Sequence, residues 1–197
     1  WVLTETARLD GVCEGDVFLM AQTATVEGSF LGDLWIASEH ADLGGDMADD
    51  VRLLVSSARI SGTIAGRLSA LAEDLQLAED SSVAKGVALW GRHLIVRGDL
   101  GGPCRLTAQQ ATFGGRCAGD LVIKADQIVI LPRAEIGGDL LYTSDRELIL
   151  HPGVNLRGRL RRIPKQPPER PGLSERVLSQ ALYAAGALFT PPENPAK

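Results

Sequence analysis

The sequence is poor in the residues that mark most catalytic and metal-binding proteins. Its 197 residues include three histidines and three cysteines, and only 5% of them are aromatic. His40, His93 and His151 share no ligand spacing and are expected at bends, so we expect no bound metal. Serine and cysteine nucleophiles have no convincing base partner, and no glycine cluster leads into a helix to form a phosphate loop. We therefore expect no enzymatic activity, no cofactor and no nucleic-acid partner.

Long apolar runs are also missing. The best candidate, residues 173–189, is shorter and more polar than the roughly 20 apolar residues that a bilayer requires, so no transmembrane helix is predicted. Nothing at the start has the apolar core of a secretion signal. The chain begins at Trp1 rather than Met, which indicates a processed product or a piece of a longer protein.

The sequence does contain a repeat of 17 residues. Residues 24–36 (ATVEGSFLGDLWI) return in outline as residues 111–123 (ATFGGRCAGDLVI), with weaker copies before, between and after them. Counted from Leu9, apolar columns lie only at even offsets, which is the period of strands with one buried face. Residues 1–6 carry no repeat and are expected to lie across the first copy. The first column is Leu9, Val26, Leu43, Ile60, Leu77, Val96, Phe113, Ile130 and Leu150.

Glycine dominates the columns at offsets two and six, which we interpret as corners because glycine tolerates positive φ and close backbone approach. The pattern predicts an all-β, right-handed parallel β-helix of about nine rungs, a rung being one copy of the repeat. A left-handed hexapeptide helix is the main alternative, but its corners recur every six residues. Three rungs carry two extra residues, at 78–82, 131–133 and 151–153, and should bulge at one edge. Cys13, Cys104 and Cys117 replace core aliphatic residues and should be buried free thiols.

The repeat stops after Leu160, where the charge changes sign. Residues 1–156 hold 12 Lys+Arg and 22 Asp+Glu, a balance of −10, whereas residues 157–170 hold six and one, a balance of +5. Apolar residues with helical spacing follow over 173–189, with Ser174 as a plausible N-cap. We therefore predict a β-helix over residues 1–162 and a basic, proline-rich linker with a C-terminal amphipathic helix over residues 163–197.

Two segments carry a resemblance to a known family. Residues 125–144 (ADQIVILPRAEIGGDLLYTS) and 153–160 (GVNLRGRL) resemble the closing rungs of bactofilin-like, polymer-forming cytoskeletal β-helix proteins, in particular their membrane-anchored relatives. The resemblance covers about residues 7–162 and implies a scaffolding role without catalysis. It implies a rod outside the cytoplasm for the anchored relatives, and a cytoplasmic filament for ordinary bactofilins. Because this chain continues past its last rung, which would block end-to-end stacking, we favour a discrete subunit over a homopolymer.

An aspartate column at offset seven has two interpretations. Its carboxylates would line a Ca²⁺ site or the acidic cleft of a polysaccharide-cleaving enzyme. They would equally accept backbone N–H bonds at the corners, and we favour this structural role because Arg67 interrupts the column. The column is Asp16, Asp33, Asp50, Asp120 and, after a bulge, Asp139.

The candidate interaction residues form three groups. Trp35 lies at an outward offset and would anchor a partner unless a neighbouring loop covers it. Basic residues after the last rungs would bind anionic lipid or an acidic protein surface, and apolar residues of the helix would enter the bilayer interface or a partner groove, or fold back over the last rung. The basic group is Arg157, Arg159, Arg161, Arg162 and Lys165, and the apolar group is Leu178, Leu182 and Phe189.

These features predict a non-enzymatic structural or scaffold protein, an accessory subunit docked on a membrane or membrane-protein complex at its extracytoplasmic, periplasmic face. Its partners would be proteins of a larger assembly, further copies of itself, or an anionic membrane surface. A bactofilin-type cytoplasmic filament is the first alternative. A carbohydrate-binding or polysaccharide-cleaving β-helix protein is the second.

Overall fold

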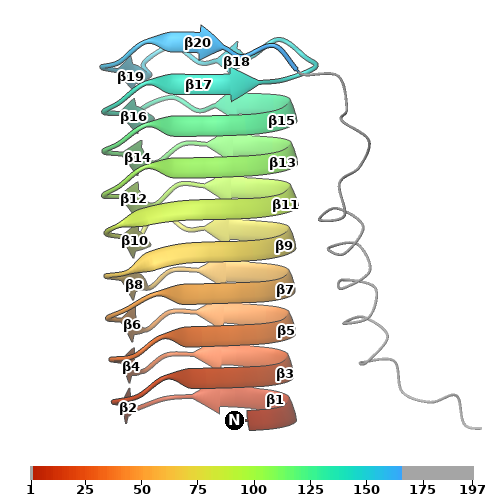
Figure 1. Ribbon diagram of the computed structural model, residues 1–197, viewed down its shortest axis with the longest axis vertical. Helices are drawn as coiled ribbons and strands as arrows, with labels where there is room; N and C mark the ends of the chain where they lie inside the picture. Colours follow the sequence, from red (N-terminus) through yellow and green to blue (C-terminus); the bar gives the residue numbers. More distant parts are fainter. Residues whose placement is uncertain (1, 166–197) are drawn as a thin grey trace, which may run out of the picture. The chain divides into compact units, whose positions relative to one another are not determined.

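The computed structural model describes residues 2–165 and shows an all-β parallel solenoid of stacked rungs (Figure 1). Long strands form an 11-stranded sheet that wraps around one edge, and nine short strands form the opposite wall. The long-strand sheet contains β1 (Val2–Leu9), β3 (Val17–Val26), β5 (Leu34–Leu43), β7 (Val51–Ile60), β9 (Arg67–Leu77), β11 (Gly86–Val96), β13 (Cys104–Phe113), β15 (Leu121–Ile130), β17 (Leu140–Thr143), β18 (Ile149–Leu150) and β20 (Leu160–Arg162). The short strands are β2 (Val12–Cys13), β4 (Ser29–Phe30), β6 (Asp46–Met47), β8 (Thr63–Ile64), β10 (Ser82–Val83), β12 (Asp99–Leu100), β14 (Arg116–Cys117), β16 (Glu135–Ile136) and β19 (Asn155–Leu156).

Neighbouring strands pair in the register of the repeat. Val26 pairs with Leu43, and Leu43 pairs with Ile60, so residues of one column stack directly on one another. These three side chains are completely buried, which confirms that the first column faces the core. The ends of the column differ because no further rung covers them: Leu9 is half-buried and Leu150 is exposed.

The two glycine columns form corners, as predicted, and the cause is close backbone approach. A Cβ on Gly45 would lie closer to the carbonyl oxygen of Gly28 than any real Cβ contact allows, and one on Gly28 would meet Gly11 in the same way. Among the glycines of the described residues, only Gly11 and Gly153 have a positive φ. These corners therefore exclude side chains, because the backbone of each corner contacts the backbone of the corner in the preceding rung.

The three insertions form turns at one edge, also as predicted. In the first, Ser81 stands where other rungs have the corner glycine, and its buried hydroxyl donates a 2.7 Å hydrogen bond to the carbonyl of Ala78. The other two contain residues with left-handed backbone conformations, Arg133 (φ 67°) and Gly153 (φ 89°). A longer turn at the corner thus replaces the tight glycine contact.

Three expectations need correction. Residues 2–6, expected with Trp1 to lie across the first rung, do not do so, because β1 (Val2–Leu9) pairs in register with β3. His40 and His93 lie within β5 and β11 rather than at bends, whereas His151 does lie at the start of a turn. Cys13 is only partly buried, since its rung is the first and no other described rung covers its outer side. The predicted C-terminal helix lies outside the described residues.

Candidate interaction sites

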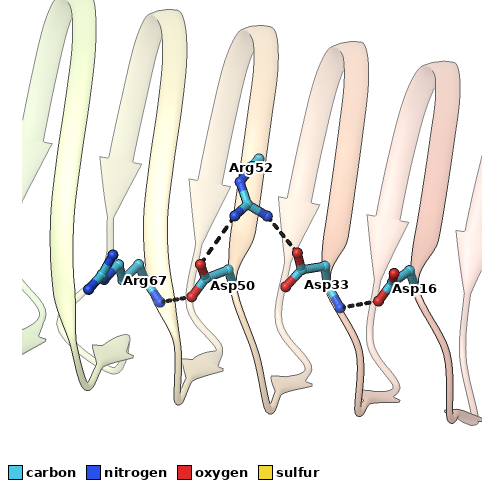
Figure 2. A network of polar contacts seen from close by, with 5 residues as sticks. All are labelled: Asp16, Asp33, Asp50, Arg52 and Arg67. Carbon is cyan, nitrogen blue, oxygen red and sulfur yellow. Dashed lines mark hydrogen bonds and ion pairs between the residues drawn. The ribbon is translucent and has the colours of Figure 1, made fainter.

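Four carboxylates of the aspartate column, those of Asp16, Asp50, Asp120 and Asp139, each link one rung to the next. The backbone N–H of Asp33 donates to Asp16 Oδ1 at 2.9 Å, and the N–H of Arg67 donates to Asp50 Oδ1 at 2.8 Å (Figure 2). Asp120 and Asp139 accept the corresponding bonds from the following rungs, each at 2.8 Å. The carboxylates thus accept backbone N–H bonds as predicted, although the donors belong to the next rung and not to their own corner. The part of the chain that the structure describes contains no cluster of three or more His, Cys, Asp or Glu residues able to hold a metal ion.

Arg52 binds the Oδ2 atoms of two aspartates of this column. Its guanidinium reaches Asp33 Oδ2 at 2.7 Å and Asp50 Oδ2 at 3.2 Å, between two adjacent rungs (Figure 2). The Arg52 Cζ atom also lies 4.6 Å from the centre of the Trp35 ring, which is a cation–π distance. The sequence did not predict this network, because Arg52 belongs to an outward column with no common residue type.

Trp35 is outward-facing, as predicted, and is held between two side chains. Its ring stacks on Phe18 with 5.9 Å between centroids and 16° between planes, and it remains 42% exposed. No loop covers it. The rings border a shallow apolar depression of about 300 Å³, whose walls include Met20 and Leu54. Trp90, which the sequence analysis did not single out, is 41% exposed on the same outward side of the long strands.

The predicted basic residues lie close together on the closing rung. Arg157 and Arg159 lie in the turn between β19 and β20, whereas Arg161 and Arg162 lie in β20, and all four are exposed. The Arg162 guanidinium donates to the carbonyl of Ser144 at 3.1 Å. Lys165, also exposed, follows directly after the rung. Cations therefore gather at one corner of the closing rung and along the strand that follows it.

Apolar side chains lie exposed among these cations. Within the described residues no further rung covers the closing rungs, so Leu150 and Leu160 of inward columns become accessible to solvent, beside Ile149 and Ile163 of outward columns. The exposed apolar residues here are Ile149 (44%), Leu150 (44%), Leu160 (45%) and Ile163 (40%). Leu178, Leu182 and Phe189, the predicted apolar anchors, lie outside the described residues. Within residues 2–165 there is no helix long and apolar enough to cross a membrane.

A polar groove that the sequence analysis missed runs across the second halves of β3 to β11. Its volume is about 510 Å³. His40 Nδ1 lies 2.7 Å from Ser57 Oγ, and His93 Nδ1 lies 2.6 Å from Asp74 Oδ1, each pair joining adjacent rungs. The expectation that no serine has a base partner is therefore wrong for Ser57. Residues 23, 40, 57 and 74 are 17 apart and all polar, which indicates an outward column, but their chemistry differs and the sequence does not indicate that they pair.

The thiols of the two buried cysteines, Cys104 and Cys117, have raised pKa values. Burial raises the pKa of the Cys104 thiol well above its ordinary value, and the neighbouring Cys117 thiol adds to the rise. Burial also raises the pKa of Cys117, whose Sγ contacts the carbonyl oxygens of Gly102 and Gly119 at 3.4 Å. All three cysteines are free thiols. A raised pKa keeps the thiol protonated and unreactive at neutral pH.

Comparison with models of known protein families, with curated proteins and with solved structures gives no match for this chain.

Proposed function

We propose that this protein is a non-enzymatic scaffold subunit that docks on a membrane or membrane-protein complex through the closing rung of its solenoid. The observation that carries the proposal is the closing rung itself, where four arginines lie next to exposed apolar residues such as Leu160 and Ile163. Anionic headgroups or acidic protein surfaces attract such cations, and apolar side chains enter the interface beside them. The balance of −10 over residues 1–156 repels the rest of the solenoid from the same surface, so docking would be end-on.

We further propose that the chain is related to the bactofilin-like proteins with membrane anchors, and that the coil is right-handed. The first point is supported by residues 125–144 and 153–160 and by the parallel solenoid. The second is supported by the general preference for right-handed crossovers and by Figure 1, in which the front strands point to the right while successive rungs rise. If the chain belongs with the membrane-anchored bactofilin-like proteins, its solenoid would lie outside the cytoplasm. A cytoplasmic filament remains the alternative.

Vesicle binding tests the docking surface. The full chain is mixed with vesicles containing phosphatidylserine or with pure phosphatidylcholine vesicles, and the bound fraction is measured by sedimentation. We expect binding to the anionic vesicles alone. Changing Arg157, Arg159 and Arg161 to Gln should weaken it by about two orders of magnitude, because each charge near the surface contributes about 1 kcal/mol.

The matched control changes three exposed cations elsewhere on the solenoid, Arg97, Arg105 and Lys124, to Gln. Both variants lose three positive charges, so their net charges are equal. Equal weakening in the two variants would mean that overall charge, and not the closing rung, determines binding. Absence of binding by the unmodified chain would exclude a lipid surface and leave an acidic protein surface as the docking partner.

A further inference from the structure

The strongest unassigned feature is the polar groove on the second halves of the long strands. One wall is a column in which His40, Ser57 and Asp74 stack rung by rung, and the other is the column of Asp42, Arg59 and Gln76. Between the walls, the floor is strand backbone at Ala41 and Ala58, whose side chains belong to the core and are only 6% and 7% exposed. We propose that this groove binds a neutral oligosaccharide laid along the solenoid axis, a function that goes beyond docking.

The two walls differ in whether their polar side chains already have hydrogen-bond partners. On the first wall the polar groups are already paired, His40 with Ser57 and Asp74 with His93, which fixes their positions. On the second wall the side chains of Asp42, Arg59 and Gln76 make no hydrogen bond or ion pair with any other described residue. Asp42 and Arg59 pair in register on adjacent strands, yet their charged groups do not meet. Free acceptors and donors of fixed spacing are therefore available to a ligand.

This donor and acceptor pattern fits sugar hydroxyls. A carboxylate accepts from two adjacent hydroxyls, a guanidinium donates in a planar fork, and an amide does both. The rungs repeat at about 4.8 Å, which is comparable with the length of one sugar ring, so successive rings would meet successive residues of each wall.

Other polymers fit less well. An extended peptide would bring its side chains to one face about every 6.7 Å, out of step with the rungs, and its backbone would find no free partner because the sheet's own ladder uses these groups. A polyanion would meet Asp42 and Asp74 directly. The Ser57 and His40 pair does not indicate cleavage, because β7 is paired on both sides and its ladder leaves no pair of free N–H groups to stabilise an oxyanion.

The proposal is tested by titrating the full chain with cellohexaose, maltohexaose and chitohexaose in a calorimeter. We expect at least one of these neutral probes to bind with a dissociation constant in the millimolar range or below. The double variant Asp42→Ala/Arg59→Ala should weaken that binding by about tenfold or more, since each ~1.4 kcal/mol of lost contact is a factor of ten. Thermal unfolding followed by circular dichroism verifies that the variant is folded.

A matched double variant, Asp46→Ala/Arg97→Ala, removes the same two residue types from exposed positions outside the groove and should bind as the unmodified chain does. Failure of all three probes to bind would overturn the proposal. Equal affinity in the two double variants, or tighter binding of an anionic hexagalacturonate than of every neutral probe, would overturn it as well. The closing rung is untouched by these changes, so either result is independent of vesicle binding.

Discussion

Asp33 Oδ2 accepts a 2.7 Å hydrogen bond from Arg52 Nη1, although the two residues are 19 positions apart and lie on adjacent rungs. The exposed fractions of the two side chains are 34% for Arg52 and 31% for Asp33. Because Arg52 also reaches Asp50, one guanidinium compensates two carboxylates that would otherwise repel each other. The same group lies over Trp35 and fixes the ring on the surface.

Replacing Arg52 by Met should therefore lower the free energy of unfolding by about 1 kcal/mol, at the upper end for partly exposed ion pairs. The methionine keeps an apolar stem against Trp35, so the loss reports on the charge. Arg92→Met is the matched control, because Arg92 pairs only with Glu73 among the described residues and both side chains are more exposed. Urea unfolding of the two variants measures the difference, and equal effects would contradict the bridging role of Arg52.

Gly44 and Gly45 are adjacent but differ in the space around them. A Cβ on Gly45 would clash with the Gly28 carbonyl, whereas the nearest atom to one on Gly44 is Ser61 Oγ at 3.5 Å. Gly45→Ala should therefore destabilise the fold by about 1–3 kcal/mol or more. Gly44→Ala should be neutral or stabilising by up to about 1 kcal/mol, because alanine reduces the entropy of the unfolded chain. Denaturant titration of both variants would refute the close-approach explanation if they lost equal stability.

Ser38 and Ser144 are both 5% exposed but differ in their hydrogen bonds. Ser144 Oγ donates to the carbonyl of Asp126 and accepts from the N–H of Arg146, whereas Ser38 Oγ has no hydrogen-bond partner among the described residues. Ser38→Ala should raise the free energy of unfolding by about 1 kcal/mol, since a buried unsatisfied hydroxyl is removed. Ser144→Ala should lower it by a similar amount. The midpoints of thermal unfolding should shift in opposite directions, and a shift in the same direction would argue against this assignment.

The sequence predicted the core and the corners because those positions repeat a residue class. The spacing of 17 residues predicts that Leu43 stacks on Ile60, and the glycine column predicts that Gly45 lies at a corner. Cys13 and residues 2–6 were mispredicted because an end rung has a neighbour on only one side. The groove was missed for a different reason: His40, Ser57 and Asp74 share position but not chemistry, and only their distances reveal the pairs.

The cysteines predict a pH dependence. Folding raises the pKa of Cys104 and Cys117, so the folded state holds protons that the unfolded state releases. Their contribution to stability is complete below the unfolded thiol pKa, about 8.5, and is lost as the pH rises above it. The urea midpoint should therefore fall more steeply between about pH 8 and 10 in the unmodified chain than in Cys104→Ala/Cys117→Ala. Cys13→Ala, at a partly buried position, should retain the steep fall, and equal slopes in all three proteins would contradict this prediction.

The three insertions all enter at the same edge of the solenoid, between a long strand and the short strand that follows. The strands themselves stay in register across each insertion, as the pairing of Leu77 with Val96 across the first one shows. Length variation is thus absorbed at one edge, and the broad faces keep a constant spacing from rung to rung. Each face therefore presents side-chain positions at the same spacing from one end of the solenoid to the other. A partner whose own structure repeats at that spacing would contact corresponding positions on every rung.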